Sequence, residues 1–236
     1  MMLLIKLLLA HVIADFFIQP KSWVAHKEKH KFKSVKLYLH VIVHVVLTAL
    51  LLWDLSLWPI LVIIGLSHFI IDGLKLTLQK KKTKRRLFFI DQILHILVIL
   101  ACFILYGNTP IPSEAFVSKG LLLLLCLMFL TLPTSIVMKT VFTKWNISEL
   151  TKSHKSLKDA GQYIGILERF LVFVFIVSGH WEAVGFLITA KSVFRFGDLK
   201  NSKHRQLTEY ILIGTLISFS IAIITALIFN VLTVYV

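Results

Sequence analysis

Residues 57–78 read LWPILVIIGLSHFIIDGLKLTL, an apolar run of the roughly 20 residues that a helix needs to cross a bilayer. His68 and Asp72 interrupt this run four positions apart. In a helix, residues at that spacing share a face and lie about 6 Å apart along the axis. Apolar surroundings make such a pair costly unless something compensates it. The stretch therefore predicts a membrane helix with a polar site built into it.

The same spacing recurs in three other apolar segments of the first hundred residues. The further pairs are His11 with Asp15, His40 with His44, and Asp91 with His95. Helices joined by short links pack as antiparallel neighbours. Four pairs on four successive helices therefore predict one shared polar site.

The composition predicts an all-α, polytopic membrane bundle. The chain has 236 residues, of which 57% are hydrophobic, and its mean hydropathy is +0.84. We expect eight transmembrane helices, at 3–19, 36–53, 57–78, 87–106, 117–138, 161–178, 181–196 and 207–234. The first lacks both the unbroken apolar middle and the small-residue cleavage site of a secretory signal, so we expect a permanent span. Pro133 predicts a kink in the fifth helix.

Basic residues alternate between the links that join these helices. The four odd-numbered links hold 20 of the 26 lysines and arginines, and the even-numbered links hold almost none. The positive-inside rule then places the odd links in the cytoplasm and both termini outside. The net charge of +14 follows from this topology and from attraction to anionic lipid at the basic loops, so we expect no nucleic-acid partner.

The helices divide into two groups of four. Residues 1–106 form an N-terminal half that carries the His/Asp cluster. Residues 107–236 form a C-terminal half with a basic cytoplasmic linker at 139–160. We expect the two halves to form one integrated membrane domain. The sequence does not predict an oligomeric state.

The chemistry of the cluster favours a divalent transition metal. Imidazole and carboxylate together suit zinc best, with manganese or iron as alternatives, whereas calcium prefers oxygen ligands alone. The candidate ligands of one or two ions are His11, Asp15, His40, His44, His68, Asp72, Asp91 and His95. Asp15 and Asp91 are candidates for a general base, and Lys75 could stabilise developing negative charge. A proton or ion pathway and purely structural polar packing remain alternatives.

A second charged cluster lies in the C-terminal half. Its candidate substrate-binding residues are Glu168, Arg169, Lys191, Arg195 and Glu209. The basic members could hold an anionic group such as a lipid phosphate. The alternative is structural, with the glutamates neutralising Arg169 or Lys191.

Several motifs resemble those of a bacterial membrane family called domain of unknown function 3307. They are HVIADFFIQ at 11–19, SHFIIDGLK at 67–75, FIDQILH at 89–95, GQYIGILERF at 161–170, GFLITAKSVFRF at 185–196 and EYILIGTLISF at 209–219. The resemblance implies the bacterial cytoplasmic membrane and brings no activity with it. The spacing of His68 and Asp72 is also similar to that in membrane-bound metal-dependent hydrolases, which is an analogy alone.

Three functions are compatible with these features. The leading hypothesis is an intramembrane metal-dependent hydrolase that acts at the cytoplasmic leaflet on a lipid-linked ester or phosphoester. The first alternative is a cation- or proton-coupled transporter or channel that uses the same cluster. The second is a membrane scaffold that binds partners or anionic lipid through its basic loops. Enzymatic activity is thus an open question, with hydrolysis favoured.

Overall fold

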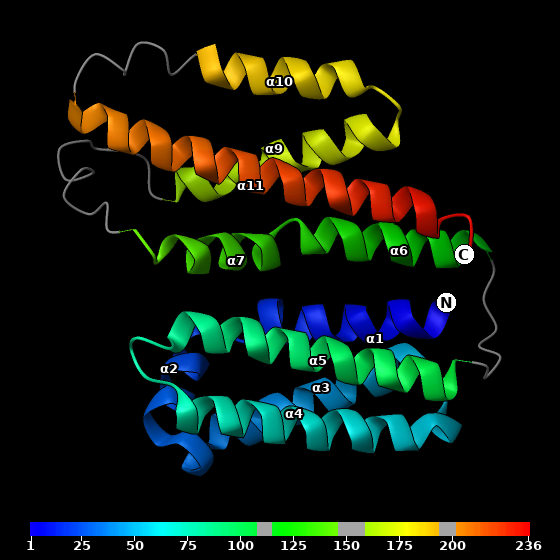
Figure 1. The fold of residues 1–236 in the computed structure, drawn as a ribbon. Coiled ribbons are helices and arrows are strands. Elements are labelled where there is room, and N and C mark those ends of the chain that lie inside the picture. The colour runs from blue at the N-terminus through cyan, green and yellow to red at the C-terminus, as the bar shows by residue number, and fades with distance from the viewer. Residues whose placement is uncertain (108–114, 146–158, 194–201) are drawn as a thin grey trace. The chain divides into compact units, whose positions relative to one another are not determined.

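The computed structural model describes residues 1–107, 115–145, 159–193 and 202–236. Every regular element in these ranges is helical, which confirms the predicted all-helical class (Figure 1). The chain divides into two compact units, residues 1–125 together with Val236, and residues 126–235. Each unit is described by itself below.

Unit 1 is built on four long helical segments and one short helix that leaves the bundle. Its elements are α1 (Met2–Val12), the π-helical turn η1 (Ile13–Ile18), α2 (Lys21–His30), η2 (Lys31–Lys33), α3 (Val35–Leu52), η3 (Leu55–Leu57), α4 (Trp58–Leu78) and α5 (Lys84–Tyr106). The chain bends by 88° between η1 and α2. Pro20 lies at this bend, where its missing N–H and fixed φ do not permit the helix to continue.

The first predicted helix, 3–19, differs from the structure in its backbone. The α-helix ends at Val12, and residues 13–18 form a π-helical turn that contains Asp15. A π turn holds more residues than an α turn, but Asp15 still lies beside His11, with its Oδ2 atom 3.8 Å from His11 Nε2. Such turns are rare and frequently occur at functional sites.

An apolar core fills the end of unit 1 that lies away from the α4–α5 turn. α3 packs against α1 and α4, and α5 packs against α4 and α1. The core residues are Leu3, Leu7, Leu52, Leu57, Ile60, Ile64, Ile99 and Cys102. They come from the beginnings of α1 and α4, from η3 and from the ends of α3 and α5. The polar residues lie in the other half of the same helices.

Unit 2 contains a broken helix and a helical pair. α6 (Ala115–Phe129) begins within the residues of unit 1, and after a break at residues 130–131 the chain continues as α7 (Leu132–Phe142). Pro133 is near the start of α7, so the predicted kink is present as a full interruption. α9 (Ala160–Val177) packs along α11 (Ser202–Leu232) and also contacts α10 (Trp181–Val193) and α7.

The chain is an integral membrane protein. Among the described residues, six segments are long and apolar enough to cross a membrane, and the bent pair formed by α1 and α2 makes a possible seventh. Eight were predicted. The predicted span at 181–196 is described only over α10, which has 13 residues, and its last three residues lie outside the described part of the chain.

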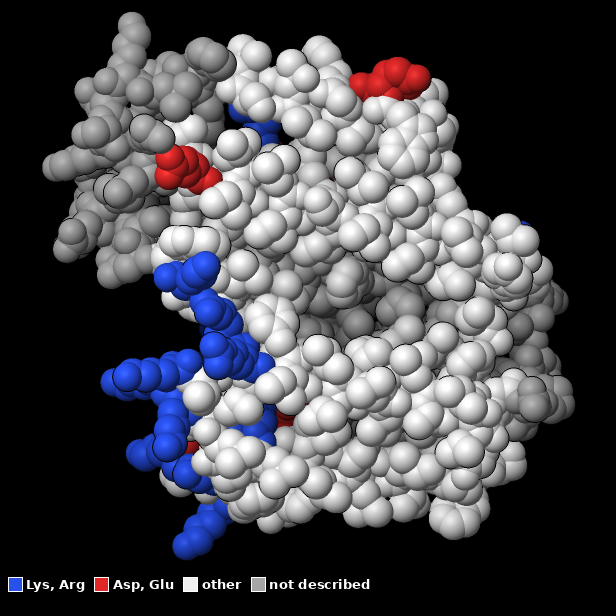
Figure 2. Space-filling view, in the orientation of Figure 1, with Lys and Arg blue, Asp and Glu red and all other residues white. Residues whose placement is uncertain are grey.

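Basic side chains gather at one end of unit 1. Figure 2 shows them at the end where α2 and the α4–α5 turn lie in Figure 1. The exposed members include Lys21, Lys29, Lys31, Lys33, Lys80, Lys81, Lys82, Lys84 and Arg86. The polar half of the bundle therefore faces its basic end.

Candidate metal centre

One histidine from each of the four helices of unit 1 meets the others inside the bundle. They are His11 of α1, His44 of α3, His68 of α4 and His95 of α5, and all four are buried. The ring of His68 lies 3.6 Å from that of His44 and 3.9 Å from that of His95, between centroids. The ring of His11 lies 5.4–5.9 Å from the other three.

The other four predicted residues lie beside these histidines, toward the basic end. They are Asp15, His40, Asp72 and Asp91. The structure thus brings all eight predicted residues together. The i,i+4 spacing accounts for this arrangement, because one helical turn separates the two members of each pair.

Three imidazoles converge on a single oxygen of Asp15. Asp15 Oδ1 lies 2.9 Å from Nε2 of His44 and 3.1 Å from Nε2 of His40. It also lies 3.5 Å from Nε2 of His68, which is itself 3.2 Å from Nε2 of His40. All four potential ligand atoms lie within 4.8 Å of one another.

These separations fit a tetrahedral metal site. Zinc–nitrogen and zinc–oxygen bonds of about 2.0–2.1 Å place tetrahedral ligand atoms about 3.4 Å apart. The separations between Asp15 and the three histidines, 2.9–3.5 Å, lie close to that value. Three nitrogens and one oxygen are also a donor set that zinc accepts.

Unsatisfied polar atoms provide a second test of the fit. Among the described residues, four buried side-chain atoms have no hydrogen-bond partner, namely His11 Nε2, His40 Nδ1, Asp91 Oδ1 and His95 Nε2. All four belong to the cluster. Each such atom costs about 1–3 kcal/mol when it is left unpaired. Their concentration at one place indicates that the cluster is built to bind a further group.

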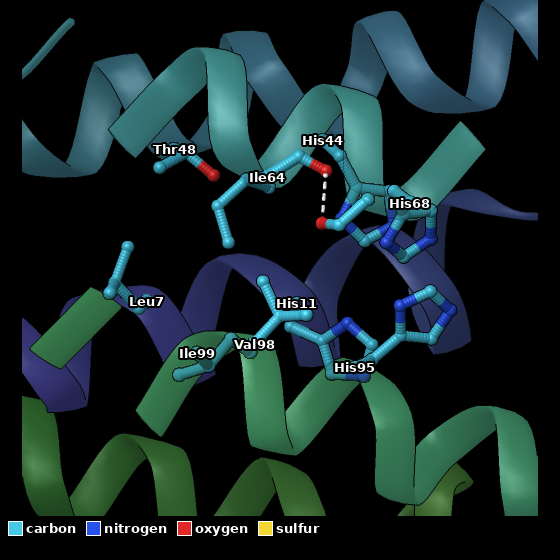
Figure 3. A pocket seen from close by; sticks show the side chains of 10 residues that line it. Leu7, His11, His44, Thr48, Ile64, His68, His95, Val98 and Ile99 are labelled. Atoms are coloured by element: carbon cyan, nitrogen blue, oxygen red, sulfur yellow. Dashed lines mark hydrogen bonds between the residues drawn. The ribbon is translucent and has the colours of Figure 1, made fainter. Parts of the chain in front are cut away.

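A small cavity adjoins the histidines on the side of the apolar core (Figure 3). Its volume is about 10 Å³, which is close to the room that one water molecule needs. Its lining consists of Leu7, His11, His44, Thr48, Ile64, Ser67, His68, His95, Val98 and Ile99. Polar imidazole edges therefore border a space that could admit water next to the convergence of ligand atoms.

Two lysines bind the remaining acids of the cluster. Lys27 Nζ donates to Asp72 Oδ2 at 2.6 Å, and Lys75 Nζ donates to Asp91 Oδ2 at 2.7 Å. His95 Nε2 lies 3.8 Å from Asp72 Oδ1 and 3.6 Å from Asp91 Oδ1. His68, Asp72 and His95 form a second group whose ligand atoms lie within 4.8 Å of one another.

Sequence reasoning missed two residues of this site. Lys27 was assigned to a basic link with its neighbours, and nothing in the sequence separates it from them. Gln92 donates to Asp15 Oδ2 at 3.0 Å and to Asp91 Oδ2 at 3.2 Å. A polar residue beside Asp91 in an apolar helix was a usable signal for Gln92.

α2 lies over the basic end of the cluster and is fastened there by contacts beyond Lys27. Glu28 accepts hydrogen bonds from Lys84 at 2.5 Å and from Gln79 at 3.1 Å. The ring of Phe32, in η2, packs directly on Gly73 of α4. A Cβ atom at Gly73 would lie 2.2 Å from Phe32 Cε1, so only glycine permits this contact.

The second predicted cluster is paired within unit 2. Lys191 Nζ donates to Glu168 Oε2 at 2.6 Å. Arg169 is buried and donates to the carbonyl oxygens of Leu130 and Thr131, which lie at the α6–α7 break, and to Ser135 and Ser218. Glu209 is exposed on α11, and Arg195 lies outside the described residues. A substrate-binding role for this cluster stays a prediction.

The comparisons with known proteins identify a family. A family model described as "Protein of unknown function (DUF3307)" matches residues 3–124, just over half of the chain. The chain belongs to this family. The DUF3307 match contains all eight residues of the His/Asp cluster as well as Lys27, Lys75 and Gln92. No curated protein and no solved structure matches the chain.

Proposed function

We propose that this member of the DUF3307 family is an intramembrane metal-dependent hydrolase of the bacterial cytoplasmic membrane, acting at the cytoplasmic leaflet on a lipid-linked ester or phosphoester. One observation carries the proposal. Asp15, His40, His44 and His68 direct four ligand atoms at one point, beside a cavity that fits a water molecule. The family description names no activity, so the proposal rests on this site.

Zinc is the preferred ion, with manganese or iron as alternatives, because the donor set combines imidazole nitrogen with carboxylate oxygen. Asp15, His40, His44 and His68 would hold it. When bound in such a site, a divalent metal activates water and polarises the bond under attack.

The residues around the cavity supply the other requirements of hydrolysis. His11 and His95 border the cavity, and the Nε2 atom of each has no hydrogen-bond partner. The His11 imidazole could accept a proton from a water molecule in the cavity. Asp91 keeps one unpaired oxygen and remains an acid–base candidate, whereas Asp15 belongs to the ligand set. Lys75 lies against Asp91 and would contribute positive charge near the reaction.

The proposed membrane topology has eight spans and both termini outside. The basic end of unit 1 then faces the cytoplasm. The cluster lies in the half of the bundle nearest that end, and the opposite half is the apolar core. A substrate would therefore approach from the cytoplasmic leaflet. The same apolar half gives a transported ion no polar path to the other side, which favours hydrolysis over transport.

The test begins with metal analysis of protein purified in mild detergent without chelators. We expect near-stoichiometric metal in the unchanged protein and in a His180→Ala control, since His180 is exposed and lies in unit 2. His44→Ala should lose the metal. Release of product from vesicles that contain lipid esters and phosphoesters should then depend on His44 and not on His180.

Two outcomes would contradict the proposal. Metal-free protein after a chelator-free purification would remove the proposed centre. Metal-loaded protein that hydrolyses none of the lipid substrates, but carries protons or metal ions into proteoliposomes, would replace hydrolysis with transport.

A further inference from the structure

The three aspartates of the cluster differ in what neutralises them. Asp72 and Asp91 each bind one lysine ammonium, at 2.6 Å and 2.7 Å. The ion-pair partners of Asp15 among the described residues are all histidines. Asp15 is therefore the one acid of the cluster whose charge is not balanced by a permanent cation.

The surroundings of Asp72 and Asp91 have the form of a second cation site. His95 Nε2 faces one oxygen of each, at 3.8 Å and 3.6 Å, and is buried without a hydrogen-bond partner. Asp91 Oδ1 is also buried and unpartnered. Lys27 and Lys75 occupy the other oxygen of each acid. Ligands for an ion are present, but two fixed cations already lie on them.

The net charge of the cluster limits how many metal ions it can bind. With neutral histidines, three aspartates and two lysines leave one negative charge. One divalent ion changes this to one positive charge, and a second would leave three. Uncompensated charge is expensive in a buried site within a membrane.

We infer that the centre binds one metal ion, at Asp15, His40, His44 and His68, and that the ammonium groups of Lys27 and Lys75 take the place of a second ion. This inference rests on the proposed function and specifies its metal site. It gives the Lys27 ammonium a role in the site that could not be inferred from its position in a basic surface helix. Its side chain is 6% exposed, whereas that of Lys29, on the same helix, is exposed.

The test measures zinc per chain in purified full-length protein, titrated with zinc alone and then freed of loosely held ions. The unchanged protein should hold one ion. Lys27→Met/Lys75→Met removes both substituting cations and should raise the number to two, because two ions then leave the same single positive charge that one ion leaves in the unchanged protein. Lys29→Met removes an exposed lysine from the same helix as Lys27 and should leave it at one.

A paired variant separates loss of metal from loss of folding. Lys27→Met leaves Asp72 without its cation, so a Lys27→Met/Asp72→Asn variant restores the net charge of the unchanged site. It should hold one ion, because Asp72 is not a ligand of the Asp15 site. Loss of that ion from folded paired variant would make Asp72 a ligand and overturn the inference.

The remaining outcomes distinguish the inference from the proposed function. Two ions in the unchanged protein would support a metal centre and overturn the inference alone, as would one ion in a folded Lys27→Met/Lys75→Met variant. No ion in the unchanged protein would overturn both the inference and the proposed function.

Discussion

Asp15 accepts three imidazole contacts through one carboxylate oxygen and a hydrogen bond from Gln92 through the other. Asp15 therefore supplies both a negative charge and the contacts to the other candidate ligands. An amide at the same position keeps the shape but removes the negative charge, and its nitrogen cannot act as a ligand atom in place of the oxygen.

Asp15→Asn should weaken zinc binding by more than the roughly 10- to 100-fold that follows loss of a residue that only orients a ligand. A competition titration with a zinc chelator measures the change. Asp54→Asn is the control, because Asp54 lies outside the cluster and accepts a hydrogen bond from the backbone of Ser56. Equal zinc affinity in both variants would remove Asp15 from the ligand set.

Gln92 touches Asp15 and Asp91 but is not itself a candidate ligand. Gln92→Leu should therefore weaken zinc binding less than Asp15→Asn does, by about 10- to 100-fold. The same titration measures the loss. A larger effect than that of Asp15→Asn would show that Gln92 has more than a positioning role.

At this scale the sequence predicted most of the site. The eight histidines and aspartates were recognisable because paired polar residues are rare in apolar segments and because i,i+4 spacing places them on one face. Lys27 was not recognisable. Its burial depends on the 88° bend that folds α2 over the cluster. The sequence does not show this bend, so it does not distinguish Lys27 from the neighbouring lysines.

Two helical segments are interrupted, and the interruptions occur at polar contacts. The π turn η1 contains Asp15, and the break between α6 and α7 exposes carbonyl oxygens that Arg169 binds. The sequence predicted the positions of both helices and the effect of Pro133. It did not predict the π turn, because residues 13–18 contain no proline or glycine that would mark a change in the helix.

Arg169 holds the broken helix together through four hydrogen bonds that a lysine cannot reproduce. Arg169→Lys should lower the free energy of unfolding by about 1–3 kcal/mol for each carbonyl left unpaired. Chemical unfolding in detergent measures this. Ser218→Ala removes one weak contact, at 3.2 Å, and should cost less. An equal cost for both would argue against this role.

The ring of Phe32 packs on Gly73 and holds η2 against α4. Gly73→Ala should displace the ring and accelerate tryptic cleavage after Lys31 and Lys33. A Phe32→Ala/Gly73→Ala variant has no steric clash but also lacks the contact, so it should be cleaved quickly as well. Gly120→Ala is a neutral control, since nothing lies within 4 Å of the added Cβ. Unchanged cleavage in Gly73→Ala would mean that other contacts hold η2.

For the whole molecule, the helical class and the membrane location followed from composition and from apolar segment length. The orientation in the membrane is a prediction from charge alone. The sequence also predicted two halves, residues 1–106 and 107–236, within one integrated domain, and this division stays a prediction beside the two units of the structure, residues 1–125 and 126–235. The family match ends at residue 124, close to the end of the continuous segment of unit 1 at residue 125.

The predicted topology places the two ends of the helices on opposite sides of the membrane, so a membrane-impermeant reagent should label only one end in intact cells. Cysteines at exposed Lys29 and Lys82 should resist a membrane-impermeant maleimide added outside intact cells, and a cysteine at Ser56 should react. The unchanged protein is the control, since Cys102 and Cys126 are buried. All three positions should react after the membrane is opened. Labelling of Lys29→Cys in intact cells would reverse the orientation.

The apolar core of unit 1 has a consequence for the energy supply of the cell. Ionisable groups deep in a membrane endanger a proton gradient if water can link them to both sides. Leu7, Ile64 and Ile99 line the cavity and belong to the apolar core, so apolar side chains separate the histidines from the end of unit 1 that lies away from the basic residues. This separation would keep a protein with ionisable groups inside the membrane from dissipating a proton gradient across it.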